Sequence, residues 1–410
     1  MTKKNTITVF EHESLRLSDD KLSKGQLESL QAFYGEKGVP YYSLIHKGVK
    51  FNSFVGVLQV GPTTIEVLPK ADGIDGEDAW RKTLIDMMRS VGLFDIHAPS
   101  QSRLSLKTNS ILDLYFELFI KHVEYLLHSG LVKKYRKVEG NKTVLKGRLM
   151  FGKHMTKNAV HKERFYVCHT TYDNQHQLHC ILYKAIHLLK RINSNALLSN
   201  RLGSLILDFP EMPDIKITES LFSKLNYNRK TEKYRNAIEI ARLLLLNYHP
   251  DVRSGQNDVL ALMFNMNLLW EKFVYSSLRK HKSSDTEIKS QTKKGFWKPD
   301  NGNRSSIKPD IVIHPNNERC VVLDTKWKNL NGKNPSPDDL RQMYVYMKYY
   351  NAKKVALVYP GGVNTPISGK YFKESSSDIG ENECSIISLA VNQDITKWQQ
   401  VIHETVSDWL

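Results

Sequence analysis

The sequence predicts a protein of mixed α+β or α/β class, in which a β-rich N-terminal region precedes a C-terminal domain of strands and helices. Two patterns support this prediction. Short β-branched runs bounded by turn residues occur in residues 1–75 and again in residues 311–323, and apolar residues recur at helical spacing between them. A chain of 410 residues with 40% hydrophobic content is long enough for two or three domains with their own cores.

Strand and helix patterns alternate along the N-terminal half. Residues 51–60 and 63–68 are strand-like runs that flank Gly61-Pro62, and this arrangement predicts a β-hairpin. Helical patterns are recognised by apolar residues three and four positions apart. They cover residues 24–37, 78–91, 110–129, 176–193 and 230–247.

A basic, β-rich segment lies between two of these helices. Residues 131–137 and 141–150 predict a hairpin that bends at Gly140, and residues 164–169 add a strand. The pattern changes to helical soon afterwards. We therefore expect three parts, namely a β-rich N-terminal region of residues 1–165, a helical connecting region of residues 166–254 and a C-terminal domain of residues 255–410.

The most informative stretch joins two strand patterns in the C-terminal domain. Residues 311–313 and 320–323 are β-branched runs joined by turn residues, so a hairpin is expected to bring Asp310 near Asp324. Since side chains alternate along a strand, Asp324 and Lys326 project from one face. Two carboxylates can hold Mg²⁺, which polarises a phosphodiester and lowers the pKa of its bound water, while a lysine stabilises the developing negative charge. The arrangement favours a metal-dependent nuclease.

Two helices are expected to contribute to the same site. Ser336-Pro337 is a strong helix start, and the helix that follows carries Gln342 and Tyr346 four residues apart on one face. Residues 259–280 form a second helical pattern, in which Glu271 lies beside the apolar stripe. A carboxylate at that position can face the hairpin.

Each of these motifs has a simpler explanation when it is taken alone. An Asp-x-Lys sequence on a strand usually marks a solvated edge, and a single acid beside an apolar stripe, such as Glu271, is more often the wet edge of a helix. Pro299-Asp300 is a second Pro-Asp pair, but it runs into turn sequence, so we select Asp310. The site prediction therefore depends on the order and spacing of all the motifs together.

The composition favours a polyanionic partner. Lys and Arg number 59 against 43 Asp and Glu, which gives a formal charge of +16. A basic run is usually a solvated face, but the run at residues 289–298 adjoins the hairpin and carries Phe296 and Trp297, which could pack against a sugar or base. The other candidate phosphate-contacting runs are residues 133–137, 146–148 and 153–162.

Several protein classes and sites are disfavoured. The sequence has no apolar run of eighteen residues and no apolar core of a secretory signal at its start, so we expect no membrane association and a cytoplasmic location. Four cysteines in so long a chain do not form a disulfide framework. A group of potential zinc ligands lacks the usual zinc-site spacing and favours a turn entering a helix instead. The group comprises Cys168, His169, His176, His179 and Cys180.

The ordered motifs resemble a known nuclease core. The order of these motifs resembles the PD-(D/E)XK, or restriction-endonuclease-like, core, in the branch that carries a Q-x-x-x-Y helix. In this sequence the order is Glu271, Pro309-Asp310, Asp324-Thr325-Lys326 and Gln342-x-x-x-Tyr346. The longer strings through Lys328 and Tyr346 resemble the McrC family, the nuclease subunits of McrBC-type modification-dependent restriction systems. Further likeness to this family's signatures is found in residues 56–61, 65–70 and 145–151. The resemblance spans about residues 50–360.

The resemblance implies a role for each site residue. Asp310 and Asp324 would be ligands of Mg²⁺, and Lys326 would stabilise charge or orient water. Glu271 would support the metal or its water. The adjoining supports would be Gln342 and Tyr346.

The resemblance also implies partners. In the family, the front half docks on an McrB-like AAA+ GTPase hexamer and stimulates its GTP hydrolysis, and the complex cuts double-stranded DNA. The sequence contains no G-x-x-x-x-G-K-[ST] motif, so GTP would be bound by the partner chain. We expect the basic residues 131–170 to contact the ring, where Arg136 or Arg148 could assist charge neutralisation near the nucleotide.

Two other functions remain open at this point. The chain could be a motor-regulating or DNA-binding module whose nuclease pocket is secondary, although the acid-acid-lysine set argues against this. It could also be a stand-alone repair nuclease of the same fold, which would cut DNA without a partner.

Overall fold

The computed structural model describes residues 5–19, 21–61, 63–70, 76–91, 111–249, 258–315, 317–330, 332–362, 366–373 and 377–410. It confirms the mixed class of strands and helices and divides into two compact units, one formed by residues 1–104 with 249–410 and the other by 105–248. These units differ from the three parts expected from the sequence. The boundary expected after residue 165 falls at the start of strand β9 (Phe165–Asp173), which pairs along its length with β7 (Lys134–Lys142) and cannot be separated from it.

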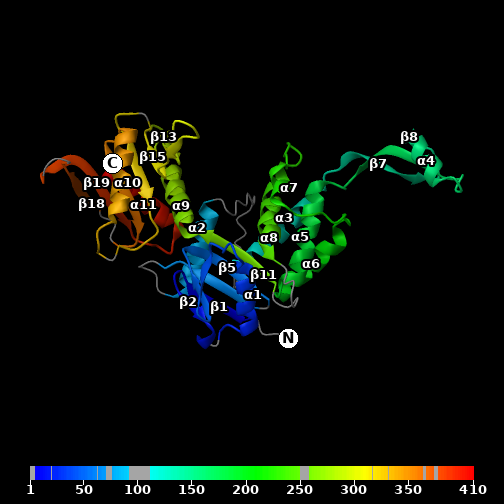
Figure 1. Ribbon diagram of the computed structural model, residues 1–410, viewed down its shortest axis with the longest axis horizontal. Helices are drawn as coiled ribbons and strands as arrows, with labels where there is room; N and C mark the ends of the chain where they lie inside the picture. The colour runs from blue at the N-terminus through cyan, green and yellow to red at the C-terminus, as the bar shows by residue number, and fades with distance from the viewer. Residues whose placement is uncertain are drawn as a thin grey trace. The chain divides into compact units, whose positions relative to one another are not determined.

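A five-stranded sheet of order β1-β6-β5-β11-β10 forms the first part of the larger unit (Figure 1). The predicted hairpin is present as β5 (Phe54–Val60) and β6 (Thr63–Leu68), which pair antiparallel. β1 (Asn5–Phe10) pairs with β6 in parallel, and β11 (Val259–Asn265) pairs antiparallel with β5. The edge strand β10 is Tyr248–His249. The second half of the chain thus supplies a strand to a sheet built by the N-terminus.

The continuous helix predicted over residues 259–280 is wrong at its start. The first part of that segment is β11, and helix α9 (Met266–His281) begins where Asn265 caps it, its side chain accepting a hydrogen bond from the backbone N–H of Leu268 at 3.2 Å. The run Val259 to Leu262 is apolar at every position. Such a run fits a strand buried on both faces as well as a helix, so periodicity alone does not separate them.

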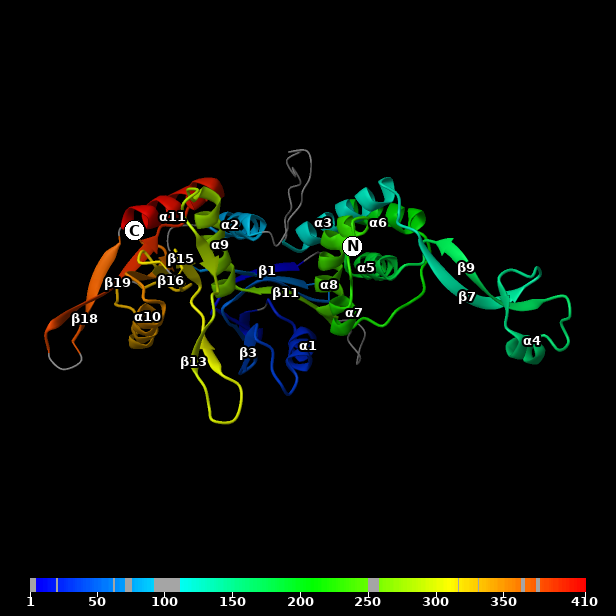
Figure 2. The same ribbon diagram turned by 90° about the horizontal axis from the view of Figure 1, so that it is seen from above.

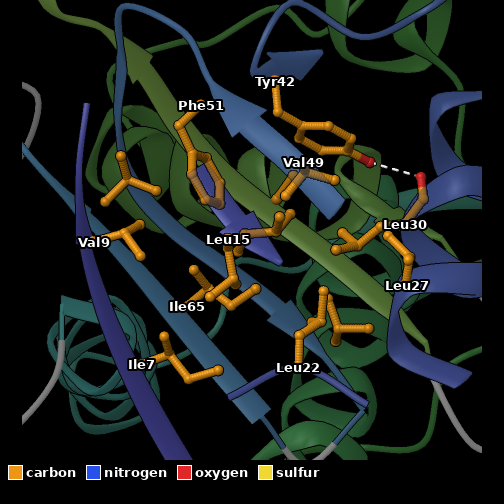
Figure 3. Close-up of a cluster of buried hydrophobic side chains, with 14 of the residues drawn as sticks. Ile7, Val9, Leu15, Leu22, Leu27, Leu30, Tyr42, Val49, Phe51 and Ile65 are labelled. Carbon is orange, nitrogen blue, oxygen red and sulfur yellow. Dashed lines mark hydrogen bonds between the residues drawn. The ribbon is translucent and has the colours of Figure 1, made fainter. Parts of the chain in front are cut away.

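An apolar core joins this sheet to a smaller sheet and a helix (Figure 3). The predicted N-terminal helix is α1 (Lys24–Tyr34), which Ser23 starts with a capping box. Tyr42 is fully buried and its hydroxyl donates to the Leu30 carbonyl oxygen at 2.7 Å, which satisfies the buried polar group. The smaller sheet has the order β2-β4-β3, formed by Ser14–Arg16, Gly48–Phe51 and Tyr42–Ile45.

A six-stranded sheet forms the C-terminal part of the same unit. The predicted hairpin is present as β15 and β16, which pair antiparallel, while β16, β17 and β19 run parallel. Antiparallel strands β12 and β18 close the two edges. In sheet order the strands are β12 (Ile288–Ser290), β15 (Ile311–Ile313), β16 (Val321–Thr325), β17 (Lys354–Pro360), β19 (Ile379–Leu389) and β18 (Ile367–Phe372).

Helices pack on this C-terminal sheet. Helix α10 (Pro337–Tyr350) starts at the predicted Ser336 cap and covers the face that presents Val322 and Val355. Helices α9 and α11 (Ile395–Trp409) pack against each other and against β16 and β19. The predicted helix α2 (Glu77–Ser90) packs against this pair. Because side chains alternate along each strand, the residues between those that face α10 are available to the second helical layer.

The smaller unit is a helical bundle that carries a β-arm. In the bundle, α5 (Gln177–Ile192) packs on α6 and α8, and α3 (Ile111–His128) packs on the same two helices. We call residues 134–173 the arm; Figure 2 shows its strands running out from the bundle. The remaining elements are α6 (Ala196–Asp208), α7 (Glu219–Ser223), α8 (Arg235–Leu246), β8 (Arg148–Leu149) and α4 (Phe151–Lys157). Across the described parts of both units, no helix combines the length and apolar character that crossing a membrane requires.

The prediction that a hairpin bends at Gly140 is wrong. Strand β7 runs straight through Gly140, which lies opposite Val167 of β9, and the chain reverses only beyond Lys142. Gly140 does not adopt a positive φ, so here the glycine marks no turn.

The potential zinc ligands have other roles. His176 caps α5, its Nδ1 accepting from the Leu178 N–H at 3.1 Å, and the buried His179 bonds the Asn174 carbonyl oxygen and the Tyr234 hydroxyl. Cys180 is buried in the bundle, whereas Cys168 and His169 lie on β9.

Candidate active site

The β15–β16 hairpin brings the two predicted aspartates together. Asp310 directly precedes β15, Asp324 lies near the end of β16, and Ile311 pairs with Leu323 between them. Val322 packs into the core under α10. Asp324, two residues further along the strand, therefore projects on the α10 side.

One cavity of about 380 Å³ collects most of the predicted site residues. Five of the six predicted site residues line this cavity. The sixth, Tyr346, does not line it but is hydrogen-bonded to Gln342, which does. The lining residues come from the end of β11, from α9, from the end of β16 and the residue after it, from α10 and from the approach to β15. They are Asn265, Asn267, Leu268, Glu271, Lys308, Asp310, Asp324, Thr325, Lys326 and Gln342.

Asp310 is held in place by one neighbour on the adjacent strand. Its Oδ2 accepts two hydrogen bonds from Thr325, one from the backbone N–H and one from the side-chain hydroxyl, each at 2.7 Å. Both donors point at the same oxygen. The carboxylate of Asp310 is therefore fixed in orientation at the wall of the cavity that the residue lines.

Asp324 is an almost buried acid, with 2% of its surface exposed. Burial and the charge of Asp310 raise the pKa of its carboxyl to about 6, against the lowering effect of Lys326. The Lys326 ammonium lies 2.6 Å from Asp324 Oδ2, and Gln342 Nε2 lies 3.4 Å from Oδ1. The negative charge of Asp324 is therefore balanced at close range by the Lys326 ammonium, 2.6 Å away.

Lys326 stays charged within this acidic environment. Burial acts to lower the pKa of its ammonium group, but the carboxylates of Asp324 and Asp339 outweigh burial, so the pKa is raised. Its Nζ also donates to Gln342 Oε1 at 3.2 Å. A fixed positive charge beside the two acids is suited to stabilise negative charge that develops on a substrate.

Glu271 faces the cavity from α9. Burial and the charge of Asp310 raise the pKa of its carboxyl, while a hydrogen bond from Gln291 Nε2 to Glu271 Oε1 at 2.7 Å acts against this rise. Gln291 Oε1 in turn accepts from Lys308 Nζ at 3.1 Å. Glu271 is therefore oriented by a chain of polar contacts, which a glutamate at a merely solvated helix edge does not need.

Gln342 and Tyr346 form the support expected from their spacing on one helix. Gln342 Nε2 donates to the Tyr346 hydroxyl at 2.7 Å, and that hydroxyl donates to the Lys308 carbonyl oxygen at 3.2 Å. This link fixes the backbone just before Pro309-Asp310. Helix α10 thereby sets the relative position of both aspartate-bearing segments.

Comparison with known proteins identifies the family. The model of the family described as McrBC 5-methylcytosine restriction system component matches residues 49–360, more than half of the chain. The chain belongs to this family. All six predicted site residues lie inside the matched range, and the resemblance to the McrC family is confirmed.

Individual members of the McrBC family show the same relationship. The Escherichia coli (strain K12) protein described as type IV methyl-directed restriction enzyme EcoKMcrBC is 24% identical over 296 residues, which is 66% of this chain and 82% of that protein. A chain of the solved Thermococcus gammatolerans assembly of McrB AAA+ hexamers with bound McrC has 19% identity and a TM-score of 0.74, covering 99% of this chain and 100% of that chain. The second comparison shows a shared fold over nearly the whole length.

Within this family framework, the cavity offers ligands suited to a hard divalent cation. Its acidic lining consists of carboxylates, and no thiol or imidazole lines it. In the described part of the chain, no three acidic, histidine or cysteine side chains are grouped closely enough to hold a metal ion. The role of Glu271 beside the metal therefore stays a prediction. The two aspartates repel each other, and a cation between them would relieve that repulsion. One or two carboxylates with water are the ligands that Mg²⁺ usually takes.

Sequence reasoning missed several supporting residues. Thr325 sits between the two motif residues Asp324 and Lys326, yet its contact with Asp310 depends on the strand register. Gln291 precedes the hairpin in a left-handed conformation with φ 50°, and its N–H donates to the Asp310 carbonyl oxygen at 2.9 Å. A non-glycine residue with positive φ leaves no signal in the sequence.

Proposed function

We propose that this chain is the Mg²⁺-dependent DNA endonuclease subunit of a GTP-dependent, modification-dependent restriction complex, and that its C-terminal sheet with α9 and α10 is a PD-(D/E)XK nuclease domain. The observation that carries this proposal is the single cavity lined by Asp310, Asp324, Glu271 and Lys326. Membership of the McrBC family supports it. We infer that the substrate is double-stranded DNA, which fits the excess of basic residues.

The residues divide the work of phosphodiester hydrolysis. Asp310 and Asp324 would hold Mg²⁺, which supplies a Lewis acid for the phosphate and lowers the pKa of a bound water. Lys326 Nζ, held by Asp324 and Gln342, stabilises the charge that develops on the phosphate oxygens. Glu271, which lines the same cavity and is oriented by Gln291, would accept a proton from the attacking water.

We further propose that the arm contacts an AAA+ GTPase partner that binds GTP. A similar fold occurs in the Thermococcus gammatolerans assembly of McrB AAA+ hexamers with bound McrC. The arm exposes several large apolar side chains, and a cluster of such side chains is typical of a surface that binds a partner. These side chains are Tyr135, Val144, Leu145, Phe151, Met155, Val160 and Tyr172.

The proposal is tested with Asp324→Ala and Lys326→Ala variants reconstituted with the cognate AAA+ GTPase. Cleavage of methylated duplex DNA should be lost in both variants, while GTP hydrolysis by the complex continues and shows that the chain still folds and docks. Asp338→Ala is a matched control, because Asp338 is an exposed acid of α10 that does not line the cavity. Persistent cleavage in the two cavity variants would show that the nuclease site lies elsewhere.

The same reconstitution separates the other functions. Cleavage by the isolated chain, with neither partner nor GTP, would indicate a stand-alone nuclease. Stimulation of GTP hydrolysis without cleavage by the unaltered chain would indicate a motor-regulating module.

A further inference from the structure

A two-stranded ribbon leaves the C-terminal sheet next to the cavity. Strands β13 (Lys294–Trp297) and β14 (Ser305–Ile307) pair antiparallel, and Figure 2 shows them continuing into a loop that extends away from the sheet. We call residues 293–308 the ribbon. The ribbon ends at Lys308, which lines the cavity, and starts two residues after Gln291, which holds Glu271. Both ends are thus tied to the candidate active site.

The base of the ribbon is fixed to the helix that supports that site. Lys294 Nζ donates to the Tyr349 carbonyl oxygen at 3.1 Å and lies 4.6 Å from the ring centroid of Tyr350. The rings of Phe296 and Tyr349 have centroids 5.1 Å apart, and the Tyr350 hydroxyl donates to the Thr292 carbonyl oxygen. Since α10 also carries Gln342, the ribbon is positioned by the same helix as the catalytic aspartates.

The exposed surface of the ribbon is basic and aromatic. Its sequence contains five Lys or Arg residues and one acid, Asp300. Within the described residues, Lys293, Lys298 and Arg304 form no ion pair, and all three are exposed. Trp297 is 61% exposed, whereas the other five tryptophans of the chain are buried. Exposed aromatic side chains among basic residues are typical of surfaces that bind nucleic acid.

The hairpin at the other edge of the same sheet has the opposite charge balance. The outer part of the β18–β19 pair is also exposed and shows Phe372 at the surface. The segment 366–383 contains two lysines but four acids. Exposure and aromatic character alone therefore do not distinguish the two edges, and charge does.

We propose that the ribbon binds duplex DNA beside the cavity by entering the major groove. Trp297 then contacts bases or sugars, and Lys298 and Arg304 contact phosphates on either side. The major groove admits a two-stranded β-ribbon, and the ribbon is directly attached to the site where the phosphodiester would be cut. The inference rests on the proposed function, because it identifies how the nuclease holds its DNA substrate.

A fluorescence experiment tests the contact directly. Trp297 is the exposed tryptophan, so acrylamide quenches its emission selectively. In the full-length Asp324→Ala chain, addition of a short duplex carrying 5-methylcytosine should protect this emission from acrylamide, and the protected fraction should be absent in the Trp297→Phe form of that chain. If the duplex binds and the emission stays equally quenchable, the ribbon does not contact the DNA and the inference is overturned.

Affinity measurements with matched variants provide a second test. Trp297→Ala should weaken duplex binding by roughly tenfold, whereas Phe372→Ala on the other hairpin should leave it unchanged. The double variant Lys298→Ala/Arg304→Ala should lower the dependence of log affinity on log salt by about two, and Lys370→Ala/Lys373→Ala serves as its control. Equal losses from both hairpins, or tighter binding of a single strand than of the duplex, would overturn the proposed groove contact.

These outcomes distinguish the inference from the proposed function. If the reconstituted complex containing Trp297→Ala binds methylated DNA with unchanged affinity and cuts it normally, the ribbon does not contact the DNA, and the proposed nuclease function stands. If DNA protects Trp297 from quenching but the reconstituted complex cuts no DNA, the proposed nuclease function fails, and the ribbon remains a DNA contact.

Discussion

Glu11 Oε1 accepts a hydrogen bond from the indole N–H of Trp327 at 2.6 Å, and both side chains are buried. Trp327 directly follows Asp324-Thr325-Lys326, and Asn267 Oδ1 accepts its backbone N–H at 3.1 Å. Glu11 follows the first strand of the N-terminal sheet, and the same Oε1 accepts the Lys70 N–H at 2.8 Å. The residue next to the candidate catalytic lysine is therefore held by the N-terminal segment of the chain.

The first prediction concerns the pH dependence of stability. Burial raises the pKa of Glu11 from 4.5 to about 7, against the lowering effect of its bonds from Lys70 and Trp327. Between these two values the folded state binds more protons than the unfolded state, so the free energy of unfolding falls as pH rises from about 4.5 to 7. Glu11→Gln should remove this loss, worth roughly 3 kcal/mol, because an amide oxygen accepts both hydrogen bonds without carrying a charge.

Urea unfolding of both forms across this pH range measures the effect. The difference in unfolding free energy between Glu11→Gln and the unaltered chain should grow in favour of the variant as pH rises, and level off above pH 7. Glu13→Gln, which changes a half-exposed acid two residues away, is the control. A difference that does not vary with pH would show that Glu11 has an ordinary pKa.

The second prediction concerns the orientation of Asp310. Thr325→Val keeps the shape and the backbone donor to Asp310 but removes the hydroxyl donor, so the unfolding free energy should fall by about 1–3 kcal/mol and DNA cleavage should decrease. Thr325→Ser keeps a hydroxyl and should restore most of the cleavage. The measurements are urea unfolding and the single-turnover cleavage rate. Equal cleavage by the valine and serine variants would show that the hydroxyl does not position the aspartate.

The third prediction concerns metal binding without catalysis. Because Asp310 raises the pKa of Asp324 by repulsion, a divalent cation bound between them should stabilise the fold. Mg²⁺ or Ca²⁺ should raise the melting temperature of the full chain by a few degrees, and EDTA should reverse the change. Asp324→Asn should lose the shift, whereas Asp338→Asn should retain it. A cation-induced shift of the same size in Asp324→Asn would place the binding site elsewhere.

The parts of the fold that the sequence predicted are those with a local cause. The hairpin carrying Asp310 and Asp324, the helix start at Ser336 and the helical pair Gln342 and Tyr346 each follow from alternation, capping or spacing, and the structure contains them. The helix predicted over residues 259–280 is wrong for the strand at its start, because the apolar run of residues 259–264 carries no periodicity.

The parts that sequence reasoning missed depend on contacts between distant segments. Glu11 meets Trp327 across 316 residues, and no pattern near either residue indicates this pairing. Gln291 reaches Glu271 only because β12 and β15 pair in one register. At Gly140 the local sequence predicted a turn that is not formed. A glycine followed by asparagine is typical of a turn, but here the pair lies within a strand. Long-range pairing, rather than local propensity, decided each of these cases.

The last prediction separates the two arginines of the arm. Arg136 Nε donates to both carboxylate oxygens of Asp173 at 3.0 Å, so its charge is already engaged. Arg148 is exposed, and its Nη2 lies 3.4 Å from the Met150 sulfur. Arg148 follows Gly147, which has a φ of +77°. A Cβ atom at position 147 would lie only 2.4 Å from the Cys168 carbonyl oxygen, so no residue with a side chain fits there. The backbone that presents Arg148 is therefore tightly defined.

Arg148→Ala should lower the partner's GTP hydrolysis, measured at a saturating concentration of this chain, by roughly 10- to 100-fold, the value of one hydrogen bond to a charged group. Binding to the partner, measured separately, should change little. Arg136→Ala should instead weaken the arm itself, because it leaves Asp173 without its cation, and should lower binding more than it lowers saturated turnover. If Arg136→Ala abolishes turnover at saturation and Arg148→Ala leaves it intact, the engaged arginine must exchange Asp173 for the nucleotide when the arm docks, and the arm would have to change its internal pairing to do so.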